Sequence, residues 1–219
     1  MDPIAELRSP LLGAVPGLRH GFVADARRAP GGLLRPRQVH GARVLPVEAL
    51  AGDPQEADGA LTRPGAPAVA VVTADCVPLL VADPAGRVAA AVHAGWRGLA
   101  AGIVERAVDA VRAVAGPGGL VAAVGPAAGP CCYETTEEIA ERLDPGGRHR
   151  RRSRPGHALL DLAGVASDRL AARDIEVDRI GGCTICDTRW PSYRREGDRA
   201  GRLLAYVGFA ARRAGEDAG

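Results

Sequence analysis

The chain of 219 residues contains no lysine, so all 28 of its basic residues are arginines. This absence excludes chemistry that needs a lysine amine, namely Schiff-base catalysis and the Walker-type phosphate loop. The 26 acidic residues nearly balance the arginines, and a net charge of +2 is too small to indicate a polyanionic partner. With only two Trp, three Tyr and two Phe, stacking platforms for bases are scarce, so nucleic acid is not expected as a partner.

Long apolar runs and a secretion signal are also missing from the sequence. No stretch of 18 residues is uninterruptedly apolar, and residues 1–6 have neither a basic region nor an apolar one. We therefore expect a cytoplasmic protein without a membrane partner. Its five cysteines are an odd number, and this favours metal binding or thiolate chemistry over a disulfide framework.

The apolar pattern predicts one domain over residues 1–219, of the α+β class, with a mixed β-sheet, hairpins and flanking helices. Residues 1–35 and 144–156 are expected to be mainly loops, the second rich in arginine. The predicted helices are 99–115, a short one opened by the capping box of Thr135 and Glu138 and ending at 143, and 163–173. The predicted strands are 18–23, 39–47, 69–72, 77–82, 87–92, 120–124, 157–162, 177–180 and a terminal segment 203–211.

A tight turn predicts that Cys76 and His93 lie close together. The segment 83–86 reads Asp-Pro-Ala-Gly, which is typical of a type I turn between two strands. In a hairpin centred on this turn, Cys76 lies opposite His93. A one-residue bulge at Gly86 shifts the register by one and still leaves their Cβ atoms roughly 5–8 Å apart.

His40, Cys76 and His93 form the best candidate site, because each lies beside small or turn-forming residues next to a predicted strand. Two imidazoles and one thiolate suit zinc, which catalytic sites often hold with three protein ligands and one open position. Taken singly, each residue is more simply explained as a packed cysteine or a solvent-facing histidine. Arg97 precedes the predicted helix 99–115, whose N-terminus would favour an anion such as phosphate.

The remaining cysteines compete for a metal. Cys183 and Cys186 have the spacing of half a structural zinc site, which the vicinal pair Cys131 and Cys132 would complete. Vicinal cysteines rarely ligate the same ion, so packing in the interior is the more usual explanation.

Two arginines near the C-terminus have two possible roles. Arg194 and Arg195 would either clamp a phosphate or pair with nearby acidic side chains, and the sequence does not decide between these roles.

Several motifs occur in a fixed order between about residues 37 and 208. They are Gln38-Val39-His40-Gly41, Asp58-Gly59, Ala74-Asp75-Cys76-Val77-Pro78, His93-Ala94-Gly95-Trp96-Arg97-Gly98, Gly129-Pro130-Cys131-Cys132-Tyr133-Glu134, Cys183-Thr184 and Ser192-Tyr193-Arg194-Arg195. Together they resemble the YfiH-type laccase-domain family, once called multicopper polyphenol oxidases. Compared with that family, residues 1–36 form a shortened N-terminal region, and the chain has no asparagine at all.

The resemblance implies a single-domain α+β fold and a metal bound by His40, Cys76 and His93, which are then also the catalytic residues. Zinc is the expected ion, and copper is the alternative. The resemblance further implies phosphorolysis of adenosine, inosine and methylthioadenosine to the base and ribose 1-phosphate, with adenosine deamination alongside. The expected partners are thus a purine nucleoside and inorganic phosphate, with Asp75, Arg97, Arg194 and Arg195 as substrate-binding candidates.

In the expected mechanism the metal polarises a substrate group or activates water, while arginines position phosphate for attack at the ribose C1′. Alternatives are copper-dependent polyphenol oxidation, a Cys–His hydrolase, a cell-wall precursor editing enzyme, and a shortened family member without catalytic activity. A multicopper centre is disfavoured because the chain has only five histidines and one methionine. The sequence leaves the oligomeric state open, a homodimer included.

Overall fold

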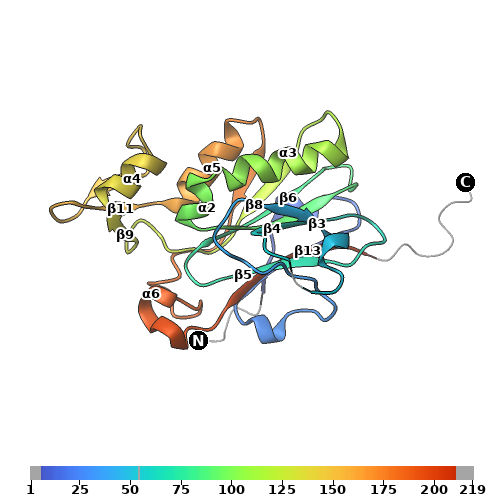
Figure 1. Ribbon diagram of the computed structural model, residues 1–219, viewed down its shortest axis with the longest axis horizontal. Coiled ribbons are helices and arrows are strands. Elements are labelled where there is room, and N and C mark those ends of the chain that lie inside the picture. Colours follow the sequence, from blue (N-terminus) through green and yellow to red (C-terminus); the bar gives the residue numbers. More distant parts are fainter. Residues whose placement is uncertain (1–5, 54, 211–219) are drawn as a thin grey trace, which may run out of the picture.

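The structure is a computed structural model and describes residues 6–53 and 55–210. These residues form three layers, with helices above a central sheet and a second sheet below it (Figure 1). The central sheet has six strands, in the spatial order β12 (Glu176–Arg179), β8 (Val121–Val124), β6 (Val77–Ala82), β7 (Ala89–Ala94), β4 (Gly59–Thr62) and β3 (Val44–Pro46). The second sheet has the order β1 (Glu6–Leu7), β2 (Leu18–Val23), β13 (Leu203–Phe209) and β5 (Val69–Thr73).

Strand β6 illustrates why a strand of the central sheet has a continuous run of apolar residues. Its side chains alternate between two faces, and both faces are buried. Leu79 and Val81 pack in the cluster that includes α3 (Ile103–Ala115) and α5 (Leu162–Ala171). Leu80 packs on the other face, against the second sheet. The fold is therefore a mixed α and β architecture, as the sequence predicts.

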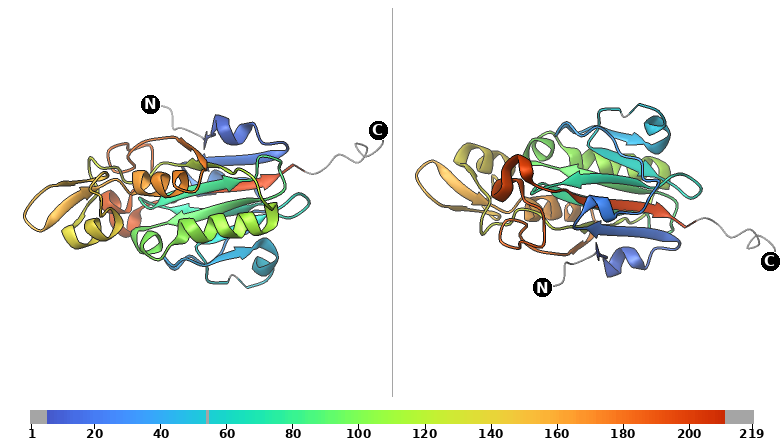
Figure 2. Two further views of the ribbon diagram at one scale, coloured as in Figure 1. Left: turned by 90° about the horizontal axis from the view of Figure 1, so that it is seen from above. Right: turned by 90° about the horizontal axis from the view of Figure 1, so that it is seen from below.

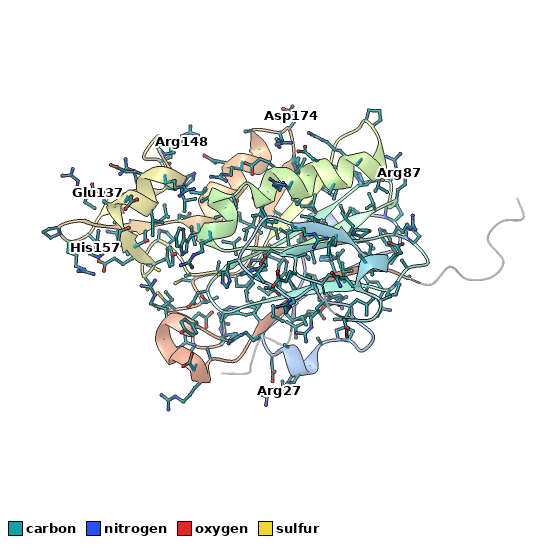
Figure 3. The ribbon with its side chains drawn as sticks, viewed as in Figure 1. Arg27, Arg87, Glu137, Arg148, His157 and Asp174 are labelled. Carbon is teal, nitrogen blue, oxygen red and sulfur yellow. The ribbon has the colours of Figure 1, made fainter. Side chains whose placement is uncertain are left out.

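One end of the molecule carries a smaller unit. A three-stranded sheet of β10 (Arg150–Arg152), β11 (His157–Leu160) and β9 (Glu134–Thr136) extends there beside α4 (Glu137–Leu143), as Figures 1 and 2 show. Glu137, Arg148 and His157 mark this end in Figure 3, and Arg87, in the turn of the β6–β7 hairpin, marks the opposite end. The open end of that hairpin therefore points toward the smaller unit.

The short helices complete the fold. They are α1 (Pro10–Gly13), α2 (Trp96–Ala100), α6 (Tyr193–Glu196) and the 3-10 helices Ala26–Arg28, Val47–Leu50 and Gly197–Arg199. Within the described part of the chain, no helix combines the length and the apolar character that a membrane span requires.

Most predicted elements are confirmed, β2 and β6 at their predicted bounds. The predicted helix 99–115 is wrong at its start, because Gly102 has φ of 82° and separates α2 from α3. The predicted strand 39–47 shrinks to β3, since residues 39–41 bind a carboxylate instead of a neighbouring strand. Two segments predicted to be mainly loop contain short elements, namely β1 and α1 within residues 1–35 and β10 within residues 144–156. The N-cap of α4 is Thr136 and not the predicted Thr135. The predicted terminal segment 203–211 is strand β13, which ends at Phe209, and residue 211 lies outside the described residues.

The predicted hairpin is present, but its register is wrong. His93 lies opposite Pro78, not Cys76. The type I turn forms as predicted, with the Gly86 N–H donating to the Asp83 carbonyl at 2.9 Å. The strands, however, close only at Asp83 and Val88, so the loop is two residues longer than the two-residue turn assumed, and Cys76 lies just outside β6.

Candidate functional site

Three side chains from separate segments meet at the open end of the β6–β7 hairpin. His93 comes from β7, Cys76 from the loop between β5 and β6, and His40 from the loop that precedes β3. Their two imidazole nitrogens and one sulfur lie within 4.8 Å of one another. The two imidazole rings meet edge to face, with centroids 4.7 Å apart. We call these three residues the triad.

A glycine leaves room for the triad. A Cβ atom at Gly95 would lie 3.0 Å from the Cys76 sulfur and 3.1 Å from Cδ2 of His40. It would lie 3.8 Å from Nε2 of His93. The space in front of Gly95 is therefore bordered by all three side chains, and any larger residue would intrude on it.

Asp58 organises two of the three triad residues. Its carboxylate is fully buried directly before β4 and accepts a hydrogen bond from Nδ1 of His93 at 2.7 Å. The same carboxylate accepts the backbone N–H groups of His40 at 2.9 Å and Gly41 at 2.6 Å. Because a carboxylate only accepts, the Nδ1 atom of His93 carries the proton and the Nε2 atom of its neutral form faces the triad with a lone pair.

The contacts within the triad change its proton affinities. Burial acts to raise the pKa of Cys76, but hydrogen bonds with His40 and His93 outweigh it and lower this pKa to about 7. Burial acts to lower the pKa of His93, but hydrogen bonds with Asp58 and Cys76 raise it to about 9. Burial likewise opposes the shift at Asp58, whose pKa is held below its ordinary value by His93 and Gly41. A thiolate is thus stabilised at neutral pH.

The backbone is strained at His40 and at Asp75, which precedes Cys76. His40 has φ of 59° and Asp75 has φ of 86°, values that residues with a side chain rarely adopt. Both conformations are fixed by hydrogen bonds to neighbouring segments. Strain that the surroundings enforce is frequent at functional sites.

Asp75, a predicted substrate-binding residue, is buried and fully engaged with protein groups. Its carboxylate accepts from the Thr184 hydroxyl at 2.7 Å and from the Arg194 backbone N–H at 2.6 Å. Its carbonyl accepts the Ala128 N–H at 2.9 Å. Asp75 therefore joins the Cys76 loop to the loops that follow β8 and β12.

Arg97 and Arg194 have exposed side chains and are connected to the triad through the backbone, since Arg97 follows His93 by four residues and the Arg194 N–H donates to Asp75, which precedes Cys76. Arg97 is the second residue of α2, not a residue ahead of a long helix, and its guanidinium lies 4.4 Å from the Trp96 ring centroid. Arg194 lies 5.3 Å from the centroid of the Tyr133 ring. Burial raises the pKa of Tyr133 to about 12, and the positive charges of Arg194 and Arg97 oppose this shift.

Arg195 is placed differently. Its guanidinium donates to the carbonyl oxygens of Thr184 at 2.6 Å and Trp190 at 2.7 Å, and it pairs with Glu196. These contacts use its donors to hold the loop after β12.

The donor set fits a resident metal ion. Two imidazole nitrogens and one sulfur are a ligand set that zinc accepts, and the Asp58–His93 hydrogen bond is the partner that metal-bound histidines usually have. Asp58 and Gly95 are not among the site residues predicted from the sequence. The sequence signal for Asp58 is its position in the motif Asp58-Gly59 before a buried strand. This motif does not show which groups the carboxylate binds, because its partners come from segments far apart in the chain.

The comparisons with known proteins agree with this fold. The family model described as "Multi-copper polyphenol oxidoreductase laccase" matches residues 16–210. The chain belongs to this laccase-domain family.

Relatives in the family are named purine nucleoside phosphorylase. One from Xylella fastidiosa is 39% identical over 190 residues, which cover 78% of this chain and 71% of the relative. One from Deinococcus radiodurans is 35% identical over 212 residues, covering 96% and 79%. One from Streptomyces coelicolor is 41% identical over 179 residues, covering 78% and 72%.

Solved structures share the fold. YlmD from Geobacillus stearothermophilus superposes with a TM-score of 0.78 at 24% identity, over 95% of this chain and 97% of that one. The hypothetical protein YfiH from Bacillus licheniformis superposes with a TM-score of 0.73 at 28% identity, over 82% and 74%.

Proposed function

We propose that the protein is a metal-dependent purine nucleoside phosphorylase that converts adenosine, inosine and methylthioadenosine to the base and ribose 1-phosphate. The observation that carries the proposal is the convergence of His40, Cys76 and His93 within 4.8 Å. The exposed Arg97 follows His93 by four residues, and the backbone of the exposed Arg194 is bound to Asp75 next to Cys76. The relatives' shared name supplies the reaction class.

In this proposal the triad holds one zinc ion, which when bound supplies a Lewis acid facing the substrate. Asp58 keeps the proton of His93 on Nδ1 and holds the His40 loop in place. Arg97 and Arg194 bind inorganic phosphate and orient one of its oxygens toward C1′ of the ribose. The bond from that oxygen to C1′ forms as the glycosidic C–N bond breaks, and the base leaves with the electron pair of that bond.

Arg195 and Asp75 are proposed to act on substrate binding through the position of Arg194. Asp75 binds the Arg194 backbone, and Arg195 orders the loop that ends at the same helix. Neither side chain needs to touch the nucleoside for this role.

Adenosine deamination is the second activity that we propose for the same site. It requires water at purine C6 and loss of the amino group as ammonia, a reaction that zinc sites with similar ligands perform on other folds. Zinc is preferred over a multicopper centre because the other histidines have different partners. His20 accepts from the Ser9 N–H, His149 bonds to Asp168, and His157 bonds to the Pro155 carbonyl.

A Cys–His hydrolase is the competing function, since Asp58, His93 and Cys76 also form an orienting acid, a base and a lowered-pKa thiol. One experiment separates the two. Protein with a measured zinc content is incubated with each nucleoside and phosphate, and base, ribose 1-phosphate and inosine are quantified with and without a chelator.

We expect base and ribose 1-phosphate in equal amounts, loss of both with the chelator, and recovery on adding zinc. Inosine formed from adenosine without phosphate reports the deaminase. Fully metal-loaded protein that releases no base from any nucleoside would refute the proposal and favour a member without catalytic activity. Turnover that survives metal removal and stops on alkylation of Cys76 would favour the hydrolase.

A further inference from the structure

The other four cysteines form a second cluster. Cys131 and Cys132 lie in the loop after β8, and Cys183 and Cys186 lie in the loop after β12. Their four sulfur atoms all lie within 4.8 Å of one another. Cys131 and Cys186 are exposed, so the expectation that these residues pack as interior hydrophobes is wrong.

The two loops are built to meet. They form an isolated parallel bridge between Ala127 and Cys183, and the Thr184 N–H donates to the Ala127 carbonyl at 3.0 Å. A Cβ atom at Gly129 would lie 3.0 Å from Cβ of Cys183 and 3.6 Å from the Cys131 sulfur. A glycine at this position therefore allows the close approach of the two cysteine pairs.

Backbone groups hold the sulfurs in their positions. The Gly129 N–H donates to the Cys183 sulfur at 3.2 Å. The Asp187 N–H donates to the Cys183 carbonyl at 3.0 Å, which closes a turn over the Cys-x-x-Cys segment. The Cys132 N–H donates to the Gly129 carbonyl at 3.0 Å, so the vicinal pair also lies in a tight turn.

Arg195 fixes the Cys-x-x-Cys turn from its other side. Its guanidinium donates to the carbonyl oxygens of Thr184 and Ile185, at 2.6 and 3.0 Å, between the two cysteines in sequence. Charge-assisted hydrogen bonds of this kind are stronger than neutral ones. The turn is thus held before any ligand binds.

The distances between sulfurs do not correspond to disulfides. The Cys186 sulfur lies 2.9 Å from that of Cys132 and 3.3 Å from that of Cys131, whereas a disulfide bond measures ~2.05 Å. Sulfurs that share a tetrahedral zinc ion lie roughly 3.8 Å apart, as follows from Zn–S bonds of ~2.3 Å. One sulfur close to two others suits convergence on a common ion, because a disulfide uses only two sulfurs.

We propose that Cys131, Cys132, Cys183 and Cys186 bind one zinc ion as a four-thiolate structural site, separate from the triad. Binding forms four Zn–S bonds and releases the protons of the four thiols to solvent. No position is left open, so the site has no role in chemistry at the metal. The four-thiolate site does not rest on the proposed function, whereas the total of two ions expected below also counts the triad zinc of that function, and the ion lost in Cys186→Ser tests the four-thiolate site alone.

The four-thiolate site stabilises the loops on which the triad depends. Thr184 lies between the two ligands Cys183 and Cys186 and donates to the Asp75 carboxylate, and Asp75 precedes Cys76. The Ala128 N–H, close to the other cysteine pair, donates to the Asp75 carbonyl. Loss of the ion is expected to loosen the Cys76 loop without removing a triad ligand.

Native mass spectrometry and elemental analysis of the full chain, purified without chelator, count the ions. We expect two zinc ions per chain, one in Cys186→Ser, and one in the matched triad variant His40→Ala. The melting temperature should fall in both variants, because each ion joins separate segments of the chain. A single zinc ion that survives Cys186→Ser and disappears in His40→Ala would overturn the proposal.

A measurement on the unsubstituted chain avoids any folding defect of the variants. Iodoacetamide labelling at alkaline pH, followed by peptide mapping, reports Cys131 and Cys186, whose side chains are exposed. We expect both to be protected in the protein as purified and to be labelled after zinc removal with a chelator. Labelling without chelator, or a disulfide between Cys132 and Cys186 in metal-free protein purified under reducing conditions, would contradict the site.

Discussion

Replacing Asp58 by asparagine removes the charge that organises the triad while keeping the side chain's shape. If the amide nitrogen takes the Oδ1 position, it faces the His40 N–H and donates to Nδ1 of His93. The proton of a neutral His93 then moves to Nε2, the atom that faces the other two ligands. If it takes the Oδ2 position, the Gly41 N–H loses its acceptor. Either orientation weakens metal binding.

The expected loss of metal affinity in Asp58→Asn is about 10–100-fold, the usual effect of removing an orienting partner. This corresponds to about 1.4–2.8 kcal/mol of binding free energy. The unpaired buried donor is expected to cost a further ~1–3 kcal/mol of folding stability. Competition with a zinc chelator measures the affinity, in a Cys186→Ser background that restricts binding to the triad.

The matched control is Asp83→Asn. Asp83 is also buried, and its carboxylate accepts the Arg87 backbone N–H, but it lies at the turn end of the hairpin, away from the triad. We expect this variant to lose stability and to keep its metal affinity. Equal zinc affinity in Asp58→Asn and the unsubstituted protein would refute the proposed role of Asp58.

Three further predictions address the site. Gly95→Ala should reduce the metal content and lower the free energy of unfolding in denaturant by ~1–3 kcal/mol, because the new Cβ atom contacts the Cys76 sulfur. The control Gly119→Ala, whose Cβ atom has no neighbour within 4 Å, should keep its metal content. Equal metal content in the two variants would contradict the packing argument. Arg97→Ala should raise the KM for phosphate about 10–100-fold, which corresponds to about 1.4–2.8 kcal/mol of binding free energy. The control Arg27→Ala, at an exposed arginine, should leave this KM unchanged. An unchanged KM in Arg97→Ala would show that Arg97 does not bind phosphate. In metal-free protein the alkylation rate of Cys76 should reach half its maximum near pH 7 and level off by about pH 8, because the pKa of this thiol is lowered from 9.0 to about 7. A rate that is still rising steeply near pH 9 would show an unshifted thiol.

The sequence predicts the layers well, because burial on both faces leaves a clear trace. The continuous apolar run of β6 and the helical spacing of Ile103, Ala107 and Val111 each indicate one type of element. The interruption at Gly102 is harder to predict. A glycine within a helical pattern is often tolerated, and only its φ of 82° shows that the chain turns there.

The turn at residues 83–86 predicts that Cys76 and His93 lie close together, although the hairpin register that it predicts is wrong. The turn chemistry at Asp83 is confirmed, but the number of residues between the strands depends on how Gly86 and Arg87 continue the loop. Cys76 and His93 are still close together despite the wrong register, because a shift of two residues leaves the same ends of the two strands adjacent.

The position of His40 depends on tertiary contacts. Residues near it have the composition of a strand, yet the Asp58 carboxylate binds three successive N–H groups, of Val39, His40 and Gly41, and replaces the strand with a loop. The meeting of the two cysteine pairs has the same origin. The spacing shows each pair, and only the pairing of the two loops shows that they converge.

Metal binding by the triad can be observed by anomalous diffraction at the zinc absorption edge, on crystals of protein purified without added metal. We expect an anomalous peak ~2.0–2.3 Å from Nε2 of His93, a ring nitrogen of His40 and the sulfur of Cys76. Clear density for these three side chains with no anomalous peak between them, in protein whose other metal is retained, would contradict it.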